Sequence, residues 1–233
     1  MTRRYYCPDL PVQGGPVVLG ESESQHAIRV MRLQVGDNIQ LFDGVGNQSD
    51  ATVIQINRRE CHCRADQAVA IDREPSCELH LGIALPKPDR AKEMIERLTE
   101  MGVRSVTPII AERTQRPPSV SLLGKLRRGV VEACKQSERN VLMRVGDPVK
   151  LPEFLSTDSA PRRLLAHPDG LAFADWIDDE APVAAQGLIG PEGGWTDAEA
   201  ADAVEAGYTK VTLGKRIYRI ETAAAVVAAR VLV

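Results

Sequence analysis

The stretch AAQGLIGPEGGWTDAEAADAVEAGYTKVTLG, residues 184–214, decides the fold class of this chain. Its two apolar ends, AAQGLIG and KVTLG, have the length of strands, and TDAEAADAVEAG between them has the composition of a helix. A sharp, glycine-rich loop, GPEGG, separates the first strand from the helix. The order strand, helix, strand is typical of a mostly parallel sheet that helices cover on both faces.

The same alternation extends backwards to residue 79. Strand-length apolar runs stand at residues 79–85, 105–110 and 162–167, and helical segments stand at 89–102 and 121–139. The first of these helices carries an apolar stripe with helical spacing, which ends at Gly102: Ala91, Met94, Ile95, Leu98 and Met101. In such α/β sheets ligands bind at the carboxyl ends of the strands, where the GPEGG loop lies.

Residues 16–70 differ from the rest of the chain. Short apolar runs broken by Gly and Asp predict a small β-barrel or sandwich. One helix is expected inside it, with Ser22 as the first residue of a capping box and Ala27, Val30 and Met31 facing inward. The polar segment 72–78 marks a boundary, so we predict one domain over residues 1–72 and a second over 73–233.

The outer face of that N-terminal helix would carry His26, Arg29 and Arg32 as a stripe. Such a stripe is either a solvated face or a set of phosphate contacts. The net charge is -3, yet residues 86–150 carry 14 basic and 8 acidic side chains, while residues 151–210 carry 3 and 12. Because salt screens distant charges, a locally basic face can bind a nucleic-acid backbone on an acidic protein.

Composition excludes several classes of protein. The 233 residues are 43% hydrophobic, which is enough for a sizeable core, and there is neither an apolar run of membrane-spanning length nor a signal-peptide pattern. Five cysteines without a regular framework predict free thiols, and CHC at residues 61–63 places its two thiols on one strand face and its imidazole on the other. We therefore predict a soluble cytoplasmic protein with no metal and no membrane partner.

Two glycine-rich loops follow late strands. The first, GPEGG, matches neither G-x-G-x-x-G nor G-x-x-x-x-G-K-[ST], and its carboxylate, Glu192, would repel a phosphate and suits a cationic or hydroxyl-bearing ligand. The second, LGKRIYRIET at residues 213–222, leads into a nearly all-apolar, alanine-rich helix. That helix is predicted to be either core or a subunit interface.

These two loops, LIGPEGG and LG-x-R-I-x-R-x-ET-A, resemble those of the bacterial 16S ribosomal RNA uridine-N3 methyltransferase family, which lies in the trefoil-knotted S-adenosylmethionine-dependent superfamily. HAIRVMRLQVGD and LFDG are similar to its N-terminal RNA-binding, PUA-like barrel, and TEMGVRSVTPIIAERT and EACKQSERN to its central signatures. The resemblance covers nearly the whole chain. It implies an α/β fold with a trefoil-knotted, mostly parallel sheet flanked by helices, a small N-terminal PUA-like β-barrel, and a homodimer.

The resemblance also implies the positions of the site. The cofactor S-adenosyl-L-methionine would lie between three walls, which contain Leu165, Ala166 and His167; Ile189, Gly190, Glu192 and Gly193; and Leu213, Gly214, Ile217, Tyr218 and Arg219. RNA would contact His26, Arg29, Arg32, Arg113 and Arg116. The family usually has Pro at Lys215, Thr at Ile220 and E-Q-x-G-R at residues 135–139, so side-chain roles at Ile220 and Lys135 do not transfer.

The reaction that the resemblance implies is methylation of uridine N3 near the 3′ end of 16S rRNA. N3 is a weakly acidic imide nitrogen, so positioning and stabilisation of negative charge should provide most of the acceleration. Arg219 is the candidate for contacting the uracil oxygens or a flanking phosphate, and either Glu221 or Glu192 for orienting the base or the positive groups of the cofactor. The alternative for Glu221 is a carboxylate that the helix dipole favours at a helix N-terminus. The alternatives are a knotted methyltransferase acting on tRNA or on a ribose 2′-hydroxyl, or a non-catalytic RNA-binding module.

Overall fold

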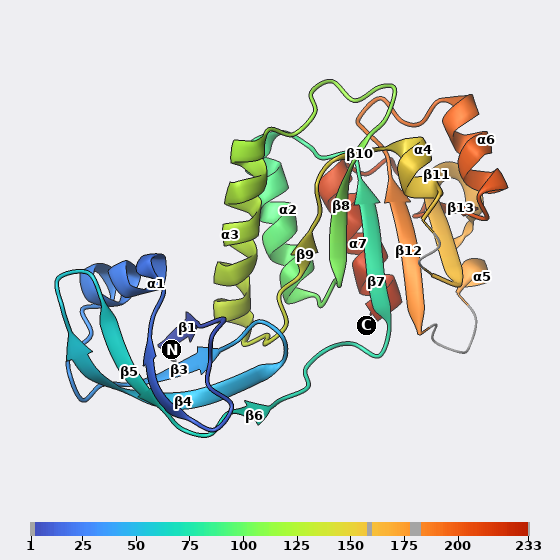
Figure 1. Ribbon diagram of the computed structural model, residues 1–233. Helices are drawn as coiled ribbons and strands as arrows, with labels where there is room; N and C mark the ends of the chain where they lie inside the picture. Colours follow the sequence, from blue (N-terminus) through green and yellow to red (C-terminus); the bar gives the residue numbers. More distant parts are fainter. Residues whose placement is uncertain (1–2, 158–159, 178–182, 233) are drawn as a thin grey trace. The chain divides into compact units, whose positions relative to one another are not determined.

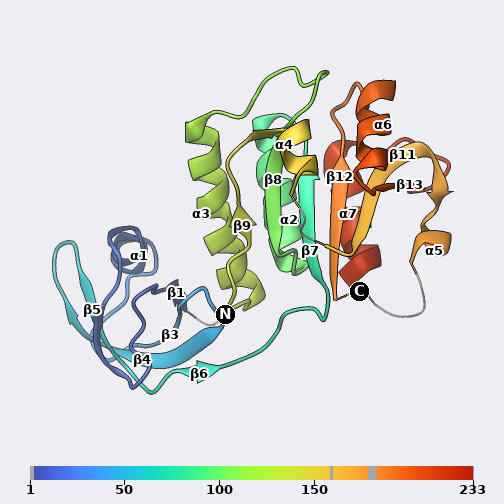
Figure 2. The same cartoon turned by 45° about the vertical axis from the view of Figure 1, so that its right-hand side comes forward.

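The computed structural model describes residues 3–157, 160–177 and 183–232. The chain forms two compact units. The N-terminal unit comprises residues up to Glu74 together with Cys134–Leu142, and the C-terminal unit comprises Pro75–Ala133 and the chain from Met143 onward. Figures 1 and 2 show the strands and helices of each unit.

The strands described in the N-terminal unit form one six-stranded sheet, in the order β1-β3-β4-β5-β2 with β6 beside β4. Strands β1 and β3 are parallel and the other pairs are antiparallel. The strands are β1 (Arg4–Tyr6), β2 (Gly15–Val18), β3 (Asn38–Phe42), β4 (Asn47–Ile56), β5 (Cys61–Ala65) and β6 (Val69–Ala70). Cys61 and Cys63 are fully buried, as the alternation in the sequence predicted, and their sulfur atoms lie 3.9 Å apart.

The helix of the N-terminal unit differs from the expectation. Helix α1 (Glu21–Gln25) begins after Gly20, without the predicted capping box at Ser22, and continues into the π-helical turn η1 (His26–Val30). The Met31 amide donates to the His26 carbonyl over 3.0 Å, a bond that spans five residues and widens the turn. Val30 and Met31 are therefore 67% and 40% exposed, and the prediction that they face inward was wrong.

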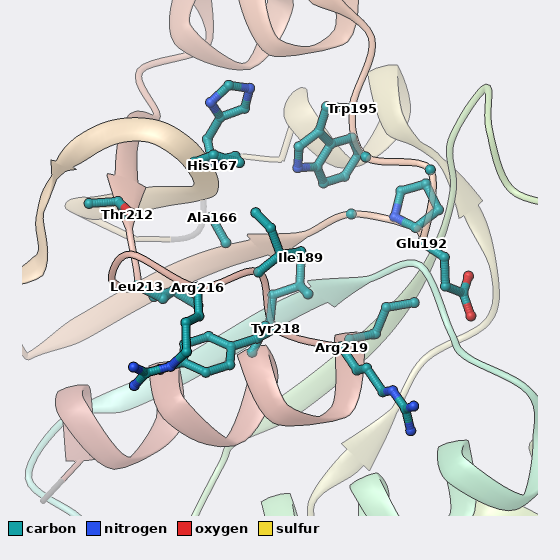
Figure 3. A pocket seen from close by; sticks show the side chains of 18 of the residues that line it. Ala166, His167, Ile189, Glu192, Trp195, Thr212, Leu213, Arg216, Tyr218 and Arg219 are labelled. Carbon is teal, nitrogen blue, oxygen red and sulfur yellow. The ribbon is translucent and has the colours of Figure 1, made fainter.

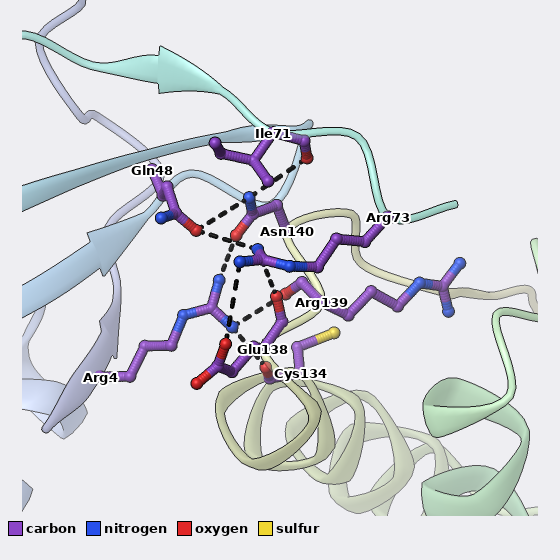
Figure 4. Close-up of polar contacts among 8 residues, drawn as sticks. All are labelled: Arg4, Gln48, Ile71, Arg73, Cys134, Glu138, Arg139 and Asn140. Carbon is purple, nitrogen blue, oxygen red and sulfur yellow. Dashed lines mark hydrogen bonds and ion pairs between the residues drawn. The ribbon is translucent and has the colours of Figure 1, made fainter. Parts of the chain in front are cut away.

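Residues 134–142 are held to the N-terminal sheet by a polar network (Figure 4). Arg4, on β1, donates to the carbonyl of Cys134 over 2.8 Å and to the side chain of Asn140. Arg73 donates to the carbonyl of Glu138 over 3.0 Å. Because Arg4 and Asn140 are almost completely buried, these bonds satisfy groups that water cannot reach.

The C-terminal unit contains a seven-stranded sheet among the described residues, in the order β10-β8-β7-β12-β11-β13 with β9 beside β8. All its pairs are parallel. The strands are β7 (Glu78–Ile83), β8 (Ser105–Ile110), β9 (Arg144–Val145), β10 (Val149–Lys150), β11 (Arg162–Ala172), β12 (Ala184–Ile189) and β13 (Thr209–Thr212). The alternation of strands and helices in the sequence therefore predicted the fold class correctly.

Helices lie on both faces of this sheet (Figures 1 and 2). They are α2 (Pro88–Glu100), α3 (Val120–Ser137), α4 (Leu151–Leu155), α5 (Phe173–Trp176), α6 (Asp197–Glu205) and α7 (Ile220–Leu232). Helices α2 and α7 pack on one face, and α4 and α6 on the other. A Cβ on Gly82 of β7 would lie 2.7 Å from the ring of Phe154 on α4, too close for a real side chain. A Cβ on Gly187 of β12 would face Val227 of α7 on the opposite side of the sheet. Glycine at these two positions therefore allows helices to pack closely on both faces.

Candidate functional site

Three loops at the carboxyl side of the sheet enclose a cavity of about 480 Å³ (Figure 3). One is an irregular stretch inside β11, where the pairing with β13 shifts register between Ala166 and Leu171. The others follow β12 and β13. The cavity is lined by Arg113, Ala166, His167, Pro168, Ile189, Gly190, Pro191, Glu192, Gly193, Gly194, Trp195, Thr212, Leu213, Gly214, Arg216, Ile217, Tyr218, Arg219, Ile220 and Ala223.

Most of the cofactor-binding residues predicted from the sequence line this cavity: His167, Ile189, Gly190, Glu192, Gly193, Leu213, Gly214, Ile217 and Tyr218. Leu165 is not a lining residue, because its side chain is fully buried in the core that also contains Leu188 and Trp195. Strand alternation explains this difference, since adjacent residues of a strand point to opposite faces.

The loop after β12 turns sharply and begins a helix. The Gly194 amide donates to the Pro191 carbonyl over 2.8 Å, and Gly194 has a φ of 70°, a conformation that glycine adopts without strain. Thr196 and Glu199 then form a capping box that starts α6. A Cβ on Gly190 would lie 2.9 Å from an indole carbon of Trp195, so glycine allows the indole to cover this wall.

The loop after β13 turns at Gly214, whose φ of 129° is a conformation that glycine adopts easily and other residues rarely adopt. The Gly214 amide donates to Thr212 Oγ1 over 3.3 Å, which holds the turn. Arg219 lies where the loop enters α7, and its carbonyl accepts the amide of Ala223 over 2.8 Å. The backbone of Arg219 is thus fixed by the helix while its side chain is exposed.

Three arginines and one carboxylate give the lining its charge: Arg113, Arg216, Arg219 and Glu192. Figure 3 shows His167 and Trp195 on one side of the pocket, and Tyr218, Arg216 and Arg219 on the other. Arg216 and Trp195 were not assigned to the site from the sequence, although Arg216 stands inside the second motif and Trp195 directly follows the first. Their place in or next to those motifs was the signal that could have found them.

Glu221 is not among the residues that line the cavity. Its Oε1 lies 3.8 Å from Nε of Arg90 on α2, and 12% of its side chain is exposed. Within the described chain, Oε2 of Glu221 is buried and has no hydrogen-bond partner. The structure therefore places Glu221 next to the pocket, in the first turn of α7, rather than in its wall.

A second polar pair supports the core beneath the pocket. Tyr208 donates its hydroxyl proton to Gln186 Oε1 over 2.5 Å, and both side chains are 2% exposed. Burial raises the pKa of Tyr208 above its usual value, so the phenol stays protonated and remains a donor. This bond links the start of β13 to β12, the two strands whose following loops line the pocket.

The predicted RNA-binding residues lie in both units. In the N-terminal unit Arg29 and Arg32 are exposed, and Arg32 has a φ of 51°. His26 is half-buried, with its Nδ1 3.2 Å from the Lys135 ammonium. In the C-terminal unit Arg113 and Arg116 are exposed in the loop after β8.

The described residues were also searched for other kinds of site. They contain no group of three or more His, Cys, Asp or Glu side chains placed to hold a metal ion. Each helix with described coordinates is too short or too polar to cross a bilayer.

Comparison with known families defines the class of protein. Residues 73–232 match the RNA methyltransferase domain family, and residues 19–66 match the RNA methyltransferase PUA domain family. These two matches place the chain in the class of RNA methyltransferases with an N-terminal PUA domain. The PUA match agrees with the domain type that the resemblance implied.

Individual relatives narrow this class to one family. The chain is 34% identical over 224 residues to ribosomal RNA small subunit methyltransferase E of Synechocystis sp., covering 92% of this chain and 72% of that protein. It is 30% identical to the crystal structure of the Neisseria gonorrhoeae ribosomal RNA small subunit methyltransferase E bound to S-adenosyl methionine, with a TM-score of 0.90 and coverage of 98% and 96%. The chain belongs to the ribosomal RNA small subunit methyltransferase E family.

A further solved structure has the same fold over nearly the whole chain. It is a protein of Legionella pneumophila in complex with the bound cofactor SAM, 27% identical, with a TM-score of 0.92 and coverage of 98% of this chain and 96% of that one.

Proposed function

We propose that this protein transfers the methyl group of S-adenosyl-L-methionine to N3 of a uridine near the 3′ end of 16S rRNA. The observation that carries the proposal is the pocket formed by the loops of β11, β12 and β13. It occurs in a chain that matches, over nearly its whole length, a relative crystallised with S-adenosyl methionine. A homodimer and a cytoplasmic location belong to the same proposal.

The pocket residues fit this cofactor. The cavity of about 480 Å³ falls within the range of small-molecule sites, roughly 300–1,000 Å³. Ile189, Leu213 and Ile217 offer apolar surface for an adenine ring, and Gly190 and Gly214 add lining without a side chain. Glu192 supplies a carboxylate for a positively charged or hydroxyl group of the ligand.

When bound, S-adenosylmethionine supplies a methyl group on a positively charged sulfonium. The chain must bring uridine N3 into line with that methyl group and stabilise the negative charge that forms on the uracil as the N3 proton leaves. Arg219 combines a helix-anchored backbone with an exposed guanidinium at the pocket. We assign it to the uracil oxygens or to the adjacent phosphate.

Glu221 has a separate assignment. It shares the first turn of α7 with Ile220, which lines the pocket, and Arg90 lies beside its carboxylate. We assign Glu221 to orienting this turn and the ligand groups next to it. A carboxylate at a helix N-terminus is also favoured by the helix dipole, so a purely structural role is the competing assignment.

N3 lies on the Watson–Crick edge, so the target uridine must be unpaired or extruded before transfer. Exposed arginines on both units, Arg29, Arg32 and Arg116, are the proposed backbone contacts, together with His26. Contacts of this kind position RNA without reading its sequence.

Reverse transcription across 16S rRNA from a strain that lacks the protein tests the substrate. A methyl group on N3 blocks pairing and stops the polymerase, so the stop near the 3′ end should disappear and return with the gene. An unchanged stop would refute the assignment. Loss of a stop in tRNA instead would support a knotted methyltransferase that acts on tRNA. A methyl group on a ribose 2′-hydroxyl leaves the base able to pair, so it would not produce the stop expected for N3 methylation.

Titration calorimetry with S-adenosylmethionine separates the enzyme from the non-catalytic RNA-binding module. The enzyme should bind the cofactor without RNA. Absence of binding at about millimolar cofactor would exclude the methyltransferase proposal, because that dissociation constant corresponds to only about 4 kcal/mol. Sedimentation of the full chain tests the homodimer.

A further inference from the structure

The side chain of Arg113 lies against the GPEGG loop, residues 190–194. Its Nη1 donates to the carbonyl of Gly193 over 2.8 Å and to the carbonyl of Trp195 over 3.2 Å. Arg113 comes from the loop after β8, which is not one of the three loops that form the pocket walls. One guanidinium nitrogen of a residue that itself lines the pocket therefore holds two carbonyls of the neighbouring wall.

Gly193 is shaped for this contact. Its φ is not in the left-handed region, so the turn itself does not require glycine there. A Cβ on Gly193 would lie 3.3 Å from Cδ of Arg113, slightly closer than side chains usually approach, and 3.4 Å from its Cβ, an ordinary contact. The missing side chain thus makes room for Arg113, and the two residues fit each other.

A second tie joins the same two segments. The amide of Glu112 donates to Glu199 Oε1 over 2.7 Å, and the other carboxylate oxygen accepts the amide of Thr196 over 2.9 Å. Glu199 is the capping-box residue of α6. Adjacent residues of the β8 loop therefore hold the pocket wall through Arg113 and hold the start of α6 through Glu199.

From these contacts we infer that Arg113 is a positioning residue for the methyl-donor pocket, which keeps residues 190–195 in their binding geometry. The inference rests on the proposed function and deepens it, and it assigns Arg113 to the cofactor wall instead of to RNA. A loop held in its binding shape before the ligand arrives loses less entropy on binding. Its hydrogen bonds join a charged donor to carbonyls and are stronger than neutral ones.

Calorimetry with S-adenosylmethionine on the full-length protein, without RNA, tests this inference. Arg113→Ala should raise the dissociation constant by about ten-fold or more, since it removes two hydrogen bonds from a charged donor. Arg113→Lys, which keeps the charge and one reachable carbonyl, should restore part of the affinity. Arg97→Ala removes a positive charge from the exposed surface of α2, at a residue that does not line the pocket, and should leave cofactor affinity unchanged.

A double-mutant cycle tests the fit between the two residues. Gly193→Ala should weaken cofactor binding in the wild-type background, because its Cβ would lie 3.3 Å from Cδ of Arg113 and the arginine side chain must shift. The same change should cost much less beside Arg113→Ala, because the obstructing side chain is gone. Equal costs in the two backgrounds would contradict the steric part of the inference.

Kinetics separate positioning from an RNA contact. Arg113→Ala should raise the KM for S-adenosylmethionine and change kcat and rRNA affinity little. Unchanged cofactor affinity with weaker rRNA binding would overturn the inference and leave Arg113 an RNA contact. If Arg113→Ala does not fold, Arg113→Lys and the Gly193→Ala titration carry the test. Failure of the wild type to bind the cofactor would instead refute the proposed function itself.

Discussion

Lys135 and Glu23 form an ion pair inside the N-terminal unit, with Lys135 Nζ 3.2 Å from Glu23 Oε2 and only 9% of each side chain exposed. The same ammonium lies 5.5 Å from the ring centre of Tyr5. Glu23 also accepts the amide of Tyr6 over 3.2 Å. Lys135 stands where the family usually has glutamate, and the structure gives it a partner that a glutamate would repel.

Lys135→Met should therefore lower the free energy of unfolding by about 3–5 kcal/mol, because it leaves the Glu23 carboxylate buried without its cation. Urea unfolding of the full chain measures this loss. Lys92→Met is the matched control: Lys92 is 64% exposed beside Glu96 and should cost at most about 1 kcal/mol. If the two variants lose similar stability, the pair at Lys135 has no special energetic role.

Arg219→Ala should abolish most methyl transfer while the protein stays folded. The side chain is exposed at the pocket, so its removal opens no core cavity. Losing a donor that stabilises charge in the transition state typically costs about 10²–10³-fold in kcat. Single-turnover transfer to rRNA measures the loss, with Arg97→Ala on α2 as a control for charge. A large fall in melting temperature for Arg219→Ala would show a structural role instead.

Glu221→Gln distinguishes a functional carboxylate from a structural one. The amide keeps the shape of the side chain and removes the charge that faces Arg90. We expect kcat to fall by about ten-fold or more, which corresponds to at least about 1.4 kcal/mol, while the melting temperature changes little. Unchanged transfer accompanied by lower stability would leave only the helix-dipole role.

The stability of the N-terminal unit should also depend on alkaline pH through Tyr5. Burial raises the pKa of Tyr5 to about 12, from an ordinary value of 10.0. The folded protein holds the Tyr5 proton more tightly than the unfolded chain does. The free energy of unfolding is therefore unaffected by ionisation of Tyr5 below pH 10 and falls as the pH rises from 10 toward 12. The loss attributable to Tyr5 is about 2–3 kcal/mol.

Tyr5→Phe tests that dependence. Within the described structure the Tyr5 hydroxyl is buried and has no hydrogen-bond partner, so its removal should be neutral or stabilising at neutral pH. The difference in unfolding free energy between wild type and Tyr5→Phe should then grow between pH 10 and 12. Burial also raises the pKa of Cys7, to about 11, but that contribution is common to both proteins. A difference that stays constant with pH would contradict the assignment to Tyr5.

Periodicity predicted the C-terminal unit well because each element there meets the core through one repeating face. Ala91, Met94, Ile95 and Leu98 of α2 are all buried, as their spacing indicated. The helix ends at Glu100, before Gly102 with its φ of 88°. The knot that the family resemblance implies stays a prediction.

Local pattern failed where the backbone departs from regular geometry or where the partner is distant in sequence. The π-helical turn at His26–Val30 rotates the side chains of this turn away from the positions they would have in an α-helix. A search for a 3.6-residue period assumes α-helical geometry and cannot detect this change. Helical spacing also indicates which face of α3 is buried but not what covers it. It therefore gave no sign that residues 134–142 pack with the N-terminal unit.

The pocket shows the same division. The sequence motifs identified the glycines of the pocket, because a tight turn often requires glycine and so leaves a recognisable pattern. The link between Arg113 and Gly193, 80 residues apart, has no local signature and needed coordinates. Sequence reasoning accordingly named most residues that line the cavity, but not the contact between Arg113 and Gly193.

Glu138 provides the last test, because it stands where the family usually has glycine and has a φ of 60°. It directly follows Ser137, the last residue of α3, a position where helices often end in the left-handed conformation. A side chain in this conformation costs roughly 1 kcal/mol compared with glycine. The Glu138 carboxylate offsets little of this, since it is 56% exposed and lies 3.7 Å from Arg73.

Glu138→Gly should therefore raise the free energy of unfolding by up to about 1 kcal/mol, whereas Glu138→Ala should lower it, because alanine keeps the strain and loses the ion pair. Urea unfolding of the two variants and wild type measures both effects. The comparison between glycine and alanine isolates the backbone term, since both remove the carboxylate. If alanine is as stable as glycine at this position, the left-handed conformation carries no measurable cost, and the departure from the family pattern is energetically neutral.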